Sequence, residues 1–262
     1  MPVRKNSWKI ERQVDKPLNL ETLTGMVLSV MPVGEYDKRL VILTKEAGKI
    51  SAFARGARRP SSALLAASQP FAFGEFQVFR GRDYYTVSAA NISNYFGELR
   101  ENLEGAYYGF YFCEFADYLT RENVEDTEIL KLLYQSLKAL TKGTIPFKLV
   151  RYIFELRLIA LNGEAPQVFE CVACGKKEEF AWFDVKKGGL LCGKCATGQL
   201  GRRRLSAALI YTMQFILSAP LEKLYTFRIS DEVLSEFSSL MEEYRAHYIG
   251  HSFKSLEILA MF

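Results

Sequence analysis

Four cysteines arranged as two Cys-x-x-Cys pairs constrain this chain more than any other sequence feature. Cys171 and Cys174 form the first pair, and Cys192 and Cys195 form the second pair after 17 intervening residues. Two residues between paired cysteines let both thiolates of a tight turn point at one tetrahedral ion, with metal–sulfur distances of about 2.3 Å. The intervening stretch is long enough for a hairpin that brings the second pair opposite the first. The sequence therefore predicts one structural Zn²⁺ ion bound by all four thiolates.

The cellular compartment decides between metal ligation and disulfide bonds. The first residues, MPVRK, do not lead into an apolar signal segment, and no stretch approaches the roughly 18 uncharged apolar residues that cross a bilayer. We therefore expect a cytoplasmic protein, in which clustered thiols favour metal ligation. Four thiolates leave no open coordination position, so the site is predicted to be structural, with disulfides or a bound iron as the alternatives. The fifth cysteine, Cys113, lies on an apolar helical stripe and is expected in the core.

The N-terminal part of the chain has the pattern of a small β-barrel. Short runs of apolar residues are separated by turn residues, and residues 45–48 join two of these runs as a hairpin. Five strands over this length fit the OB-fold, a barrel that often binds single-stranded nucleic acid, although a fold alone does not give a function. The predicted strands are 25–30, 39–44, 49–54, 73–80 and 84–89.

The rest of the chain is predicted to be mostly helical. Apolar residues recur every three to four positions after residue 95, and the first stripe consists of Leu99, Leu103, Ala106, Phe110 and Cys113. The fold class is therefore α+β. We expect a polar extension at 1–19, an OB-fold nucleic-acid-binding domain at 20–95, and a helical domain at 96–262 that includes a zinc-binding segment at 168–200.

Positive charge is concentrated in the predicted barrel. Residues 1–95 contain 14 Lys and Arg against 8 Asp and Glu, whereas the whole chain carries a net charge of only +4. Strand alternation places Phe53 on the same face as Lys49, opposite Ile50, so that an aromatic ring lies among cations. Such a surface binds a single strand with little sequence preference. The alternative is that Phe53 faces the core and the cations only keep the barrel soluble. The predicted DNA-binding residues are Lys38, Arg39, Lys49, Phe53, Arg55, Arg58 and Arg59.

Other polar clusters support no catalytic prediction. Arg202, Arg203 and Arg204 could prolong a nucleic-acid track, although arginine triplets at domain edges are more often solvated. His247 and His251, the only histidines, have no accompanying carboxylate motif for a metal site. The sequence contains no phosphate-binding loop, nucleophile elbow, kinase signature or dinucleotide fingerprint. We therefore expect that the protein is not an enzyme.

Several motifs together resemble the RecO family of bacterial DNA repair proteins, over about residues 20 to 260. The strand motifs GMVL and GEYDKR are followed by LT, GK and ARGARRPSS, and the helical part contributes FELRL, Pro166 before the first cysteine pair, and the ending KSL. The resemblance implies an N-terminal OB-fold, a helical domain with a zinc site and a non-enzymatic role. The predicted cations from Lys38 to Arg59 fall within the matching basic motif.

The resemblance also implies a function and a set of partners. Proteins of this family bind single-stranded DNA, anneal complementary strands and act with RecR, in some cases also RecF, to load RecA on DNA covered by the single-strand-binding protein SSB. Double-stranded DNA is a further candidate ligand. The family recognises the acidic, Phe-ending SSB tail on its helical domain, and Arg151 and Arg157 are our candidate charge partners for it. The alternative is a zinc-ribbon RNA-binding or transcription-associated OB-fold protein.

Overall fold

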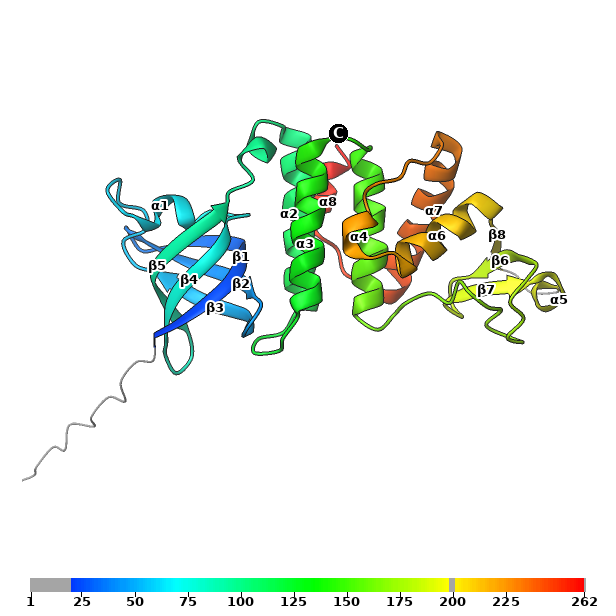
Figure 1. The fold of residues 1–262 in the computed structure, drawn as a ribbon, viewed down its shortest axis with the longest axis horizontal. Coiled ribbons are helices and arrows are strands. Elements are labelled where there is room, and N and C mark those ends of the chain that lie inside the picture. Colours follow the sequence, from blue (N-terminus) through cyan, green and yellow to red (C-terminus); the bar gives the residue numbers. More distant parts are fainter. Residues whose placement is uncertain (1–19, 198–200, 262) are drawn as a thin grey trace, which may run out of the picture.

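A computed structural model describes residues 20–197 and 201–261, and the predicted extension at 1–19 lies outside the described residues. The first part of the chain forms a closed barrel with the strand order β1-β2-β3-β5-β4 (Figure 1). Its pairings are antiparallel except for β3 with β5, which is parallel and closes the barrel. The strands are β1 (Leu20–Val33), β2 (Asp37–Thr44), β3 (Gly48–Ala54), β4 (Phe73–Arg80) and β5 (Tyr85–Asn94).

Alternation along the strands separates the barrel interior from its outer surface. Along β3, every second residue is buried, and Ile50 and Ala52 pack with Phe76 of β4 in the interior. The β2–β3 register runs without a bulge, so Phe53 faces outward as predicted. A short helix, α1 (Leu64–Ala67), lies between β3 and β4.

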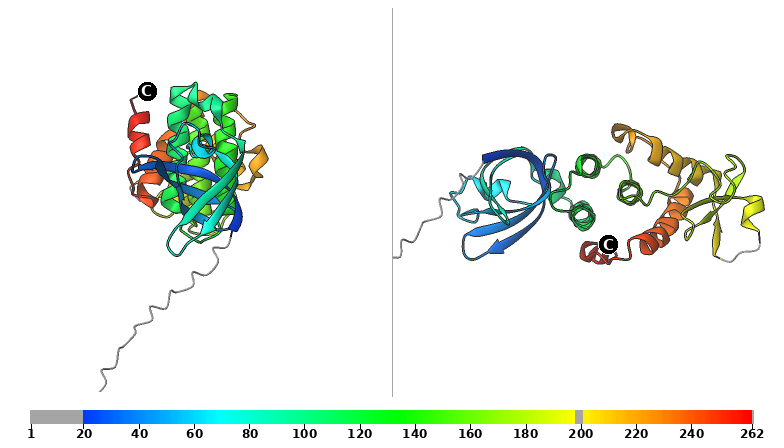
Figure 2. Two further views of the ribbon diagram at one scale, coloured as in Figure 1. Left: turned by 90° about the vertical axis from the view of Figure 1, so that its left-hand side faces the viewer. Right: turned by 90° about the horizontal axis from the view of Figure 1, so that it is seen from below.

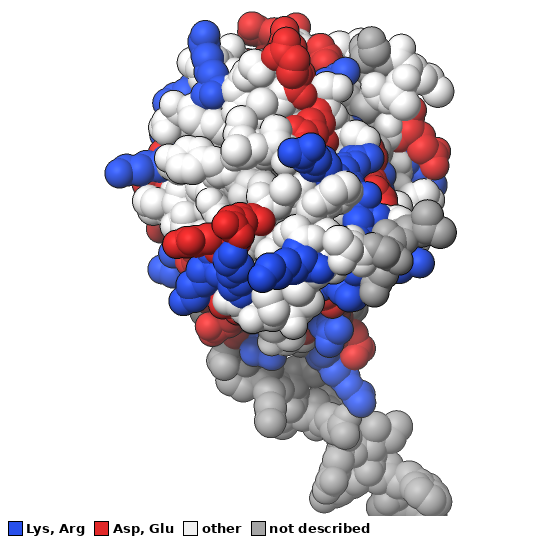
Figure 3. Space-filling model, turned by 90° about the vertical axis from the view of Figure 1, so that its right-hand side faces the viewer, with Lys and Arg blue, Asp and Glu red and all other residues white. Residues whose placement is uncertain are grey.

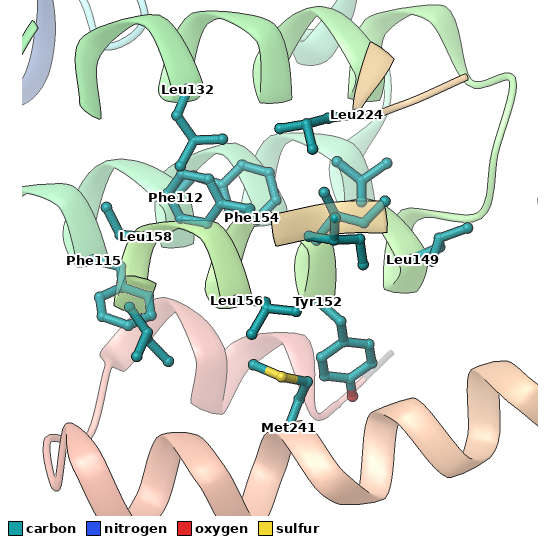
Figure 4. Packing of buried hydrophobic residues seen from close by; sticks show 14 of the residues in the cluster. Phe112, Phe115, Leu132, Leu149, Tyr152, Phe154, Leu156, Leu158, Leu224 and Met241 are labelled. Carbon is teal, nitrogen blue, oxygen red and sulfur yellow. The ribbon is translucent and has the colours of Figure 1, made fainter. Parts of the chain in front are cut away.

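Helices make up the centre of the molecule. The barrel, the helices and the cysteine-bearing segment lie in a row along the long axis of the molecule (Figures 1 and 2). Phe112 and Phe154 stack at 4.3 Å between α2 and α4, Leu132 of α3 lies beside Phe112, and Met241 of α7 lies beside Leu156 (Figure 4). The elements are η1 (Gly97–Arg100), α2 (Leu103–Leu119), α3 (Thr127–Lys142), α4 (Phe147–Leu161), α6 (Ala207–Ser218), η2 (Leu221–Lys223), α7 (Asp231–Tyr248) and α8 (Lys254–Leu259).

The apolar stripe predicted for helix α2 and the preceding η1 is confirmed at Leu99, Ala106 and Cys113 and was wrong at its other two positions. Leu103 and Phe110 are exposed, whereas Tyr111, Phe112 and Phe115 are fully buried. The helix packs against β1, α3, α4 and α8, so residues around most of its circumference are covered. A single stripe cannot describe a helix that is covered on several sides. Cys113 is buried, as predicted.

The cysteine-bearing segment forms a small three-stranded sheet, with the order β7-β6-β8. The hairpin predicted between the cysteine pairs is formed by β6 (Phe180–Asp184) and β7 (Gly189–Cys192), and it is followed by α5 (Gly193–Ala196) and β8 (Arg202–Arg204). The expectation that the arginine triplet is solvated was wrong for Arg202. Its side chain is 2% exposed and its Nε lies 3.6 Å from Asp184 Oδ2, because β8 pairs directly with β6.

The barrel is joined to the helical domain by contacts between β3 and the α2–α3 connection. Gly48 forms a β-bridge with Glu122, and Lys49 Nζ donates to the backbone oxygen of Asp117 at 2.6 Å. The outer sides of β1 and β2 also contribute Met26 and Leu43 to the core of the helical domain. Among the described residues, no helix has the length and apolar character that crossing a membrane requires.

Candidate nucleic-acid interface and metal centre

The four cysteines of the two pairs meet at one point of the cysteine-bearing segment. The Sγ atoms of Cys171, Cys174, Cys192 and Cys195 all lie within 4.8 Å of one another, and none is in a disulfide. Cys174 Sγ and Cys192 Sγ are 3.8 Å apart. Four sulfurs at about 2.3 Å from one tetrahedral ion lie about 3.8 Å from each other, so this donor set fits Zn²⁺.

The environment of the four cysteines favours deprotonated thiolates that bind one common metal ion. Burial alone would raise the pKa of Cys171, but donated backbone N–H groups outweigh it and lower the pKa to about 6. One of these donors, Cys192 N, lies 3.4 Å from Cys171 Sγ. The neighbouring sulfur of Cys174 acts in the opposite direction and raises the pKa of Cys195 to about 12. Four sulfurs this close can therefore all be deprotonated only when a metal ion neutralises their charge.

The outer face of β2 and β3 carries the centre of the predicted nucleic-acid surface. Arg39 lies directly across from Phe53 in the β2–β3 register, and its Nε donates to Ser51 Oγ at 2.9 Å. Phe53 is half-buried and Arg39 is exposed. The guanidinium is therefore held by a neutral hydroxyl beside an accessible ring, and its charge stays available for a phosphate.

Sequence reasoning missed the β4–β5 loop, which supplies a second aromatic ring to this face. Tyr84 is 46% exposed and packs edge-on against Phe53, with ring centroids 5.0 Å apart. A hollow of 370 Å³ beside the pair is lined by Arg55, Arg82 and Tyr84 among others. The sequence places Tyr84 at the start of the predicted strand 84–89 and assigns it no role, whereas the parallel β3–β5 pairing brings it next to Phe53. We name Arg39, Phe53, Arg55, Arg82 and Tyr84 the strand face.

Three other predicted cations surround the β1–β2 turn. Arg58 Nη1 donates to Gly34 O at 3.1 Å, and the Arg59 guanidinium lies 4.8 Å from the centre of the Tyr36 ring. Both arginines are exposed. Lys38 differs, because its Nζ donates to Ser68 O at 2.8 Å, and burial followed by the nearby charge of Arg58 lowers its pKa. Arg58 and Arg59 therefore remain free to contact an anion, whereas Lys38 is occupied within the barrel.

Lys49 is held against the helical domain, although it also lines a small hollow with Arg82 and Tyr84 of the β4–β5 loop. The β2–β3 register places it opposite Leu43, near the helical domain, whereas Arg39 and Phe53 lie toward the other end of the strand pair. Its Nζ forms an ion pair with Asp117 Oδ1 at 2.9 Å. Of the seven predicted DNA-binding residues, the structure thus brings Arg39, Phe53 and Arg55 to one face.

Arg151, one of the two candidate partner-binding residues, lines a pocket of 880 Å³ between α2, α4, α7 and α8. Its Nε lies 2.7 Å from Glu155 Oε1, and its Nη2 lies 2.6 Å from Glu242 Oε1. Lys148 and Arg245 contribute further positive charge to the same wall. The pocket combines these cations with apolar side chains from Phe253, Leu256 and Leu259.

Arg157, the other candidate, lies outside the residues that line this pocket. Its Nη1 donates to Leu217 O at 2.7 Å and to Ile216 O at 3.2 Å, the last carbonyls of α6. Burial lowers the pKa of this half-buried guanidinium. Its contacts therefore make Arg157 a cap that satisfies the end of α6.

The surface at the end of the molecule that carries the four cysteines is neither mainly positive nor mainly negative. Figure 3 views this end and shows basic and acidic side chains interspersed over it. Arg203 lies 3.8 Å from Glu243, and Lys176 is paired with Glu179. A mixed surface does not focus the potential that a polyanion needs. The cationic candidate surface is therefore the strand face, together with Arg58 and Arg59.

A closed five-stranded barrel joined to a helical domain defines an OB-fold protein whose helical part carries a four-cysteine cluster that could hold a metal ion. The family model described as "Recombination protein O N terminal" matches residues 18–96, and "Recombination protein O C terminal" matches residues 100–257. The chain belongs to the RecO family of DNA repair proteins, and this gives it a role in DNA repair and recombination.

Individual relatives agree over nearly the whole chain. The DNA repair protein RecO of Acetivibrio thermocellus is 31% identical over 244 residues, which cover 92% of this chain and 97% of that protein. The RecO protein of Symbiobacterium thermophilum is 34% identical over 245 residues, covering 92% and 96%. That of Alkaliphilus metalliredigens is 32% identical over 236 residues, covering 89% and 96%.

Proposed function

We propose that the protein is a non-enzymatic recombination mediator that binds single-stranded DNA on the strand face. The observation that carries this is the Arg39–Phe53 cross-strand pair, extended by Tyr84 through its 5.0 Å ring contact. Aromatic rings stack on unpaired bases and contribute about 1–3 kcal/mol per base, whereas guanidinium groups bind the phosphates. Bases of a duplex are already stacked on one another, so exposed rings favour the single strand.

The barrel and the helical domain then have different functions. We assign DNA capture to residues 20–95 and partner docking to the helical domain at 96–262, whose segment 168–200 one Zn²⁺ ion holds in shape. Annealing requires no catalytic group, because partial neutralisation of two strands raises their rate of encounter. Together with RecR, and with RecF in some settings, the protein would load RecA onto SSB-coated DNA in the cytoplasm, at the nucleoid.

We place the acidic, Phe-ending tail of SSB in the pocket beside Arg151. A peptide with carboxylates and one bulky apolar side chain needs cations next to an apolar wall. The pocket supplies Lys148, Arg151 and Arg245 on one side and Phe253 with Leu256 on another. Arg157 has no part in this proposal, since its guanidinium caps α6.

A salt titration tests the DNA-binding proposal. Labelled single-stranded DNA is titrated at several salt concentrations with the parent and with variants Arg39→Ala and Arg55→Ala. Each lost phosphate contact should make the log–log slope of affinity against salt shallower by about 0.7. Lys131→Ala is the matched control, because Lys131 is an exposed cation on α3 paired with Glu128. An unchanged slope in both strand-face variants would reject the surface, and equal competition by RNA of the same sequence would favour the RNA-binding alternative.

A further inference from the structure

The pocket beside Arg151 already contains a carboxylate of the protein itself. Glu242 Oε1 lies 2.6 Å from Arg151 Nη2, and Glu242 Oε2 lies 2.9 Å from Arg245 Nη2. Tyr152 also donates its hydroxyl to Glu242 Oε1 at 3.3 Å. One carboxylate therefore bridges the two guanidinium groups that line the pocket.

The accessibility of these side chains shows which group faces solvent. The Glu242 side chain is 45% exposed, whereas those of Arg151 and Arg245 are 10% and 13% exposed. An anion that enters from solvent thus meets Glu242 before it reaches either guanidinium. Burial is the largest single influence on the pKa of Glu242 and raises it, but the charges and hydrogen bonds of Arg151 and Arg245 together outweigh burial and hold the pKa below its usual value, so the group stays ionised at neutral pH.

The charges of the cluster are balanced without a ligand. Glu155 is fully buried, and its Oε1 accepts from Arg151 Nε at 2.7 Å and from the Tyr111 hydroxyl at 2.6 Å. Two carboxylates, Glu155 and Glu242, thus face two guanidinium groups, and the other charged residues of the pocket lining, Lys148 with Glu104 and Glu257, add no net positive charge. An additional carboxylate would bring an uncompensated negative charge into a partly desolvated site, which is costly. Release of Glu242 into solvent removes that excess.

We propose that Glu242 is an internal competitor for the partner's carboxylate: an acidic peptide binds in the pocket only by displacing Glu242 from Arg151 and Arg245. This inference rests on the proposed function, since it concerns the pocket to which we assign the SSB tail. Displacement exchanges one carboxylate for another, so part of the binding free energy is offset and the peptide can leave readily. The competition would keep docking weak and reversible, as a hand-over between proteins requires.

Fluorescence anisotropy tests the competition with a labelled peptide of three Asp residues that ends in Phe with a free carboxylate. The variant Glu242→Gln keeps the shape of the side chain and removes its charge. It should bind the peptide about fivefold to tenfold more tightly than the parent, and added salt should narrow the difference. Glu243→Gln is the matched control, because Glu243 neighbours Glu242 on α7 but faces Arg203. It should bind as the parent does.

Two further samples make each outcome decisive. The amidated peptide, which lacks the terminal carboxylate, should gain less from Glu242→Gln, and Glu242→Ala should reproduce the gain if Gln disturbs the fold. If Glu242→Gln and Glu242→Ala bind the peptide no more tightly than the parent and have an unchanged circular dichroism spectrum, the proposed competition is overturned. The pocket then remains a docking site. Absence of peptide binding in the parent and all variants overturns the docking site and the competition together.

Discussion

Lys49 Nζ lies 2.9 Å from Asp117 Oδ1, so a cation that the strand pattern assigns to the nucleic-acid surface ties the barrel to α2 instead. The Lys49 side chain is only 18% exposed. We expect Lys49→Ala to lower the free energy of unfolding by about 1 kcal/mol in urea titrations, through loss of the ion pair and of a hydrogen bond. The salt slope of DNA binding should stay at the parent value. If Lys49→Ala made the salt dependence of DNA affinity as shallow as Arg39→Ala does, Lys49 would belong to the DNA-binding surface.

Removal of the proposed Zn²⁺ ion should unfold the cysteine-bearing segment and leave the barrel folded. Structural zinc sites supply much of the folding free energy of their segments. Trp182 on β6 packs with Cys171, Leu191 and Cys192, so its fluorescence reports on this segment. In a Trp8→Phe background, a chelator should shift the emission to longer wavelength and release one Zn²⁺ per chain. DNA binding by the strand face should persist, and its loss would show that the metal site and the barrel are coupled.

Gly48 should tolerate no side chain. Its φ is +62°, and an added Cβ would lie 1.9 Å from the backbone oxygen of Val124. Gly48→Ala therefore combines backbone strain with a clash against the α2–α3 connection, and we expect a loss of at least about 3 kcal/mol in unfolding free energy. Gly34 is the control, with a φ of +55° and open space around it. Gly34→Ala should cost about 1 kcal/mol, from the backbone alone. Equal losses in the two variants would contradict the close contact.

The ion pairs of Glu242 predict an acid-sensitive contribution to stability. Burial raises the pKa of Glu242, but the charges and hydrogen bonds of Arg151 and Arg245 together keep it below its usual value in the folded protein. This contribution is therefore present above the pKa of the unfolded chain and is lost as pH falls through the lower, folded value. Urea midpoints measured from pH 6 to pH 3 should fall more steeply for the parent than for Glu242→Gln. Parallel curves would exclude Glu242 as the group responsible.

Local patterns in the sequence predicted the elements of this fold well. The strand predicted at 73–80 coincides with β4, and the strands predicted at 39–44 and 49–54 lie within β2 and β3. Alternation also placed Phe53 outside the barrel, because β3 pairs without a bulge and has one covered face. The cysteine spacing predicted the four-sulfur cluster, since two tight turns and a hairpin are all local structures.

Features that depend on contacts distant in sequence could not be predicted in this way. Arg202 is covered because β8 pairs with β6, which lies some twenty residues earlier in the chain. Arg151 points into an ion-pair cluster because Glu242 comes from α7, 91 residues away. Tyr84 joins Phe53 only through the parallel closure of the barrel. Spacing along the chain does not encode such partners, and they decide which charges remain available to ligands.

The parallel β3–β5 pairing has a consequence for crowded copies of the protein. Because it closes the barrel, each of the five strands has a neighbour on both sides, although β5 pairs with β3 only at Tyr85 and Thr86. Barrels that lie side by side along one bound DNA strand would then meet mainly through their side chains, and only short stretches of backbone could extend another sheet. Copies can therefore gather at one site with little of the strand-to-strand association that leads to aggregates.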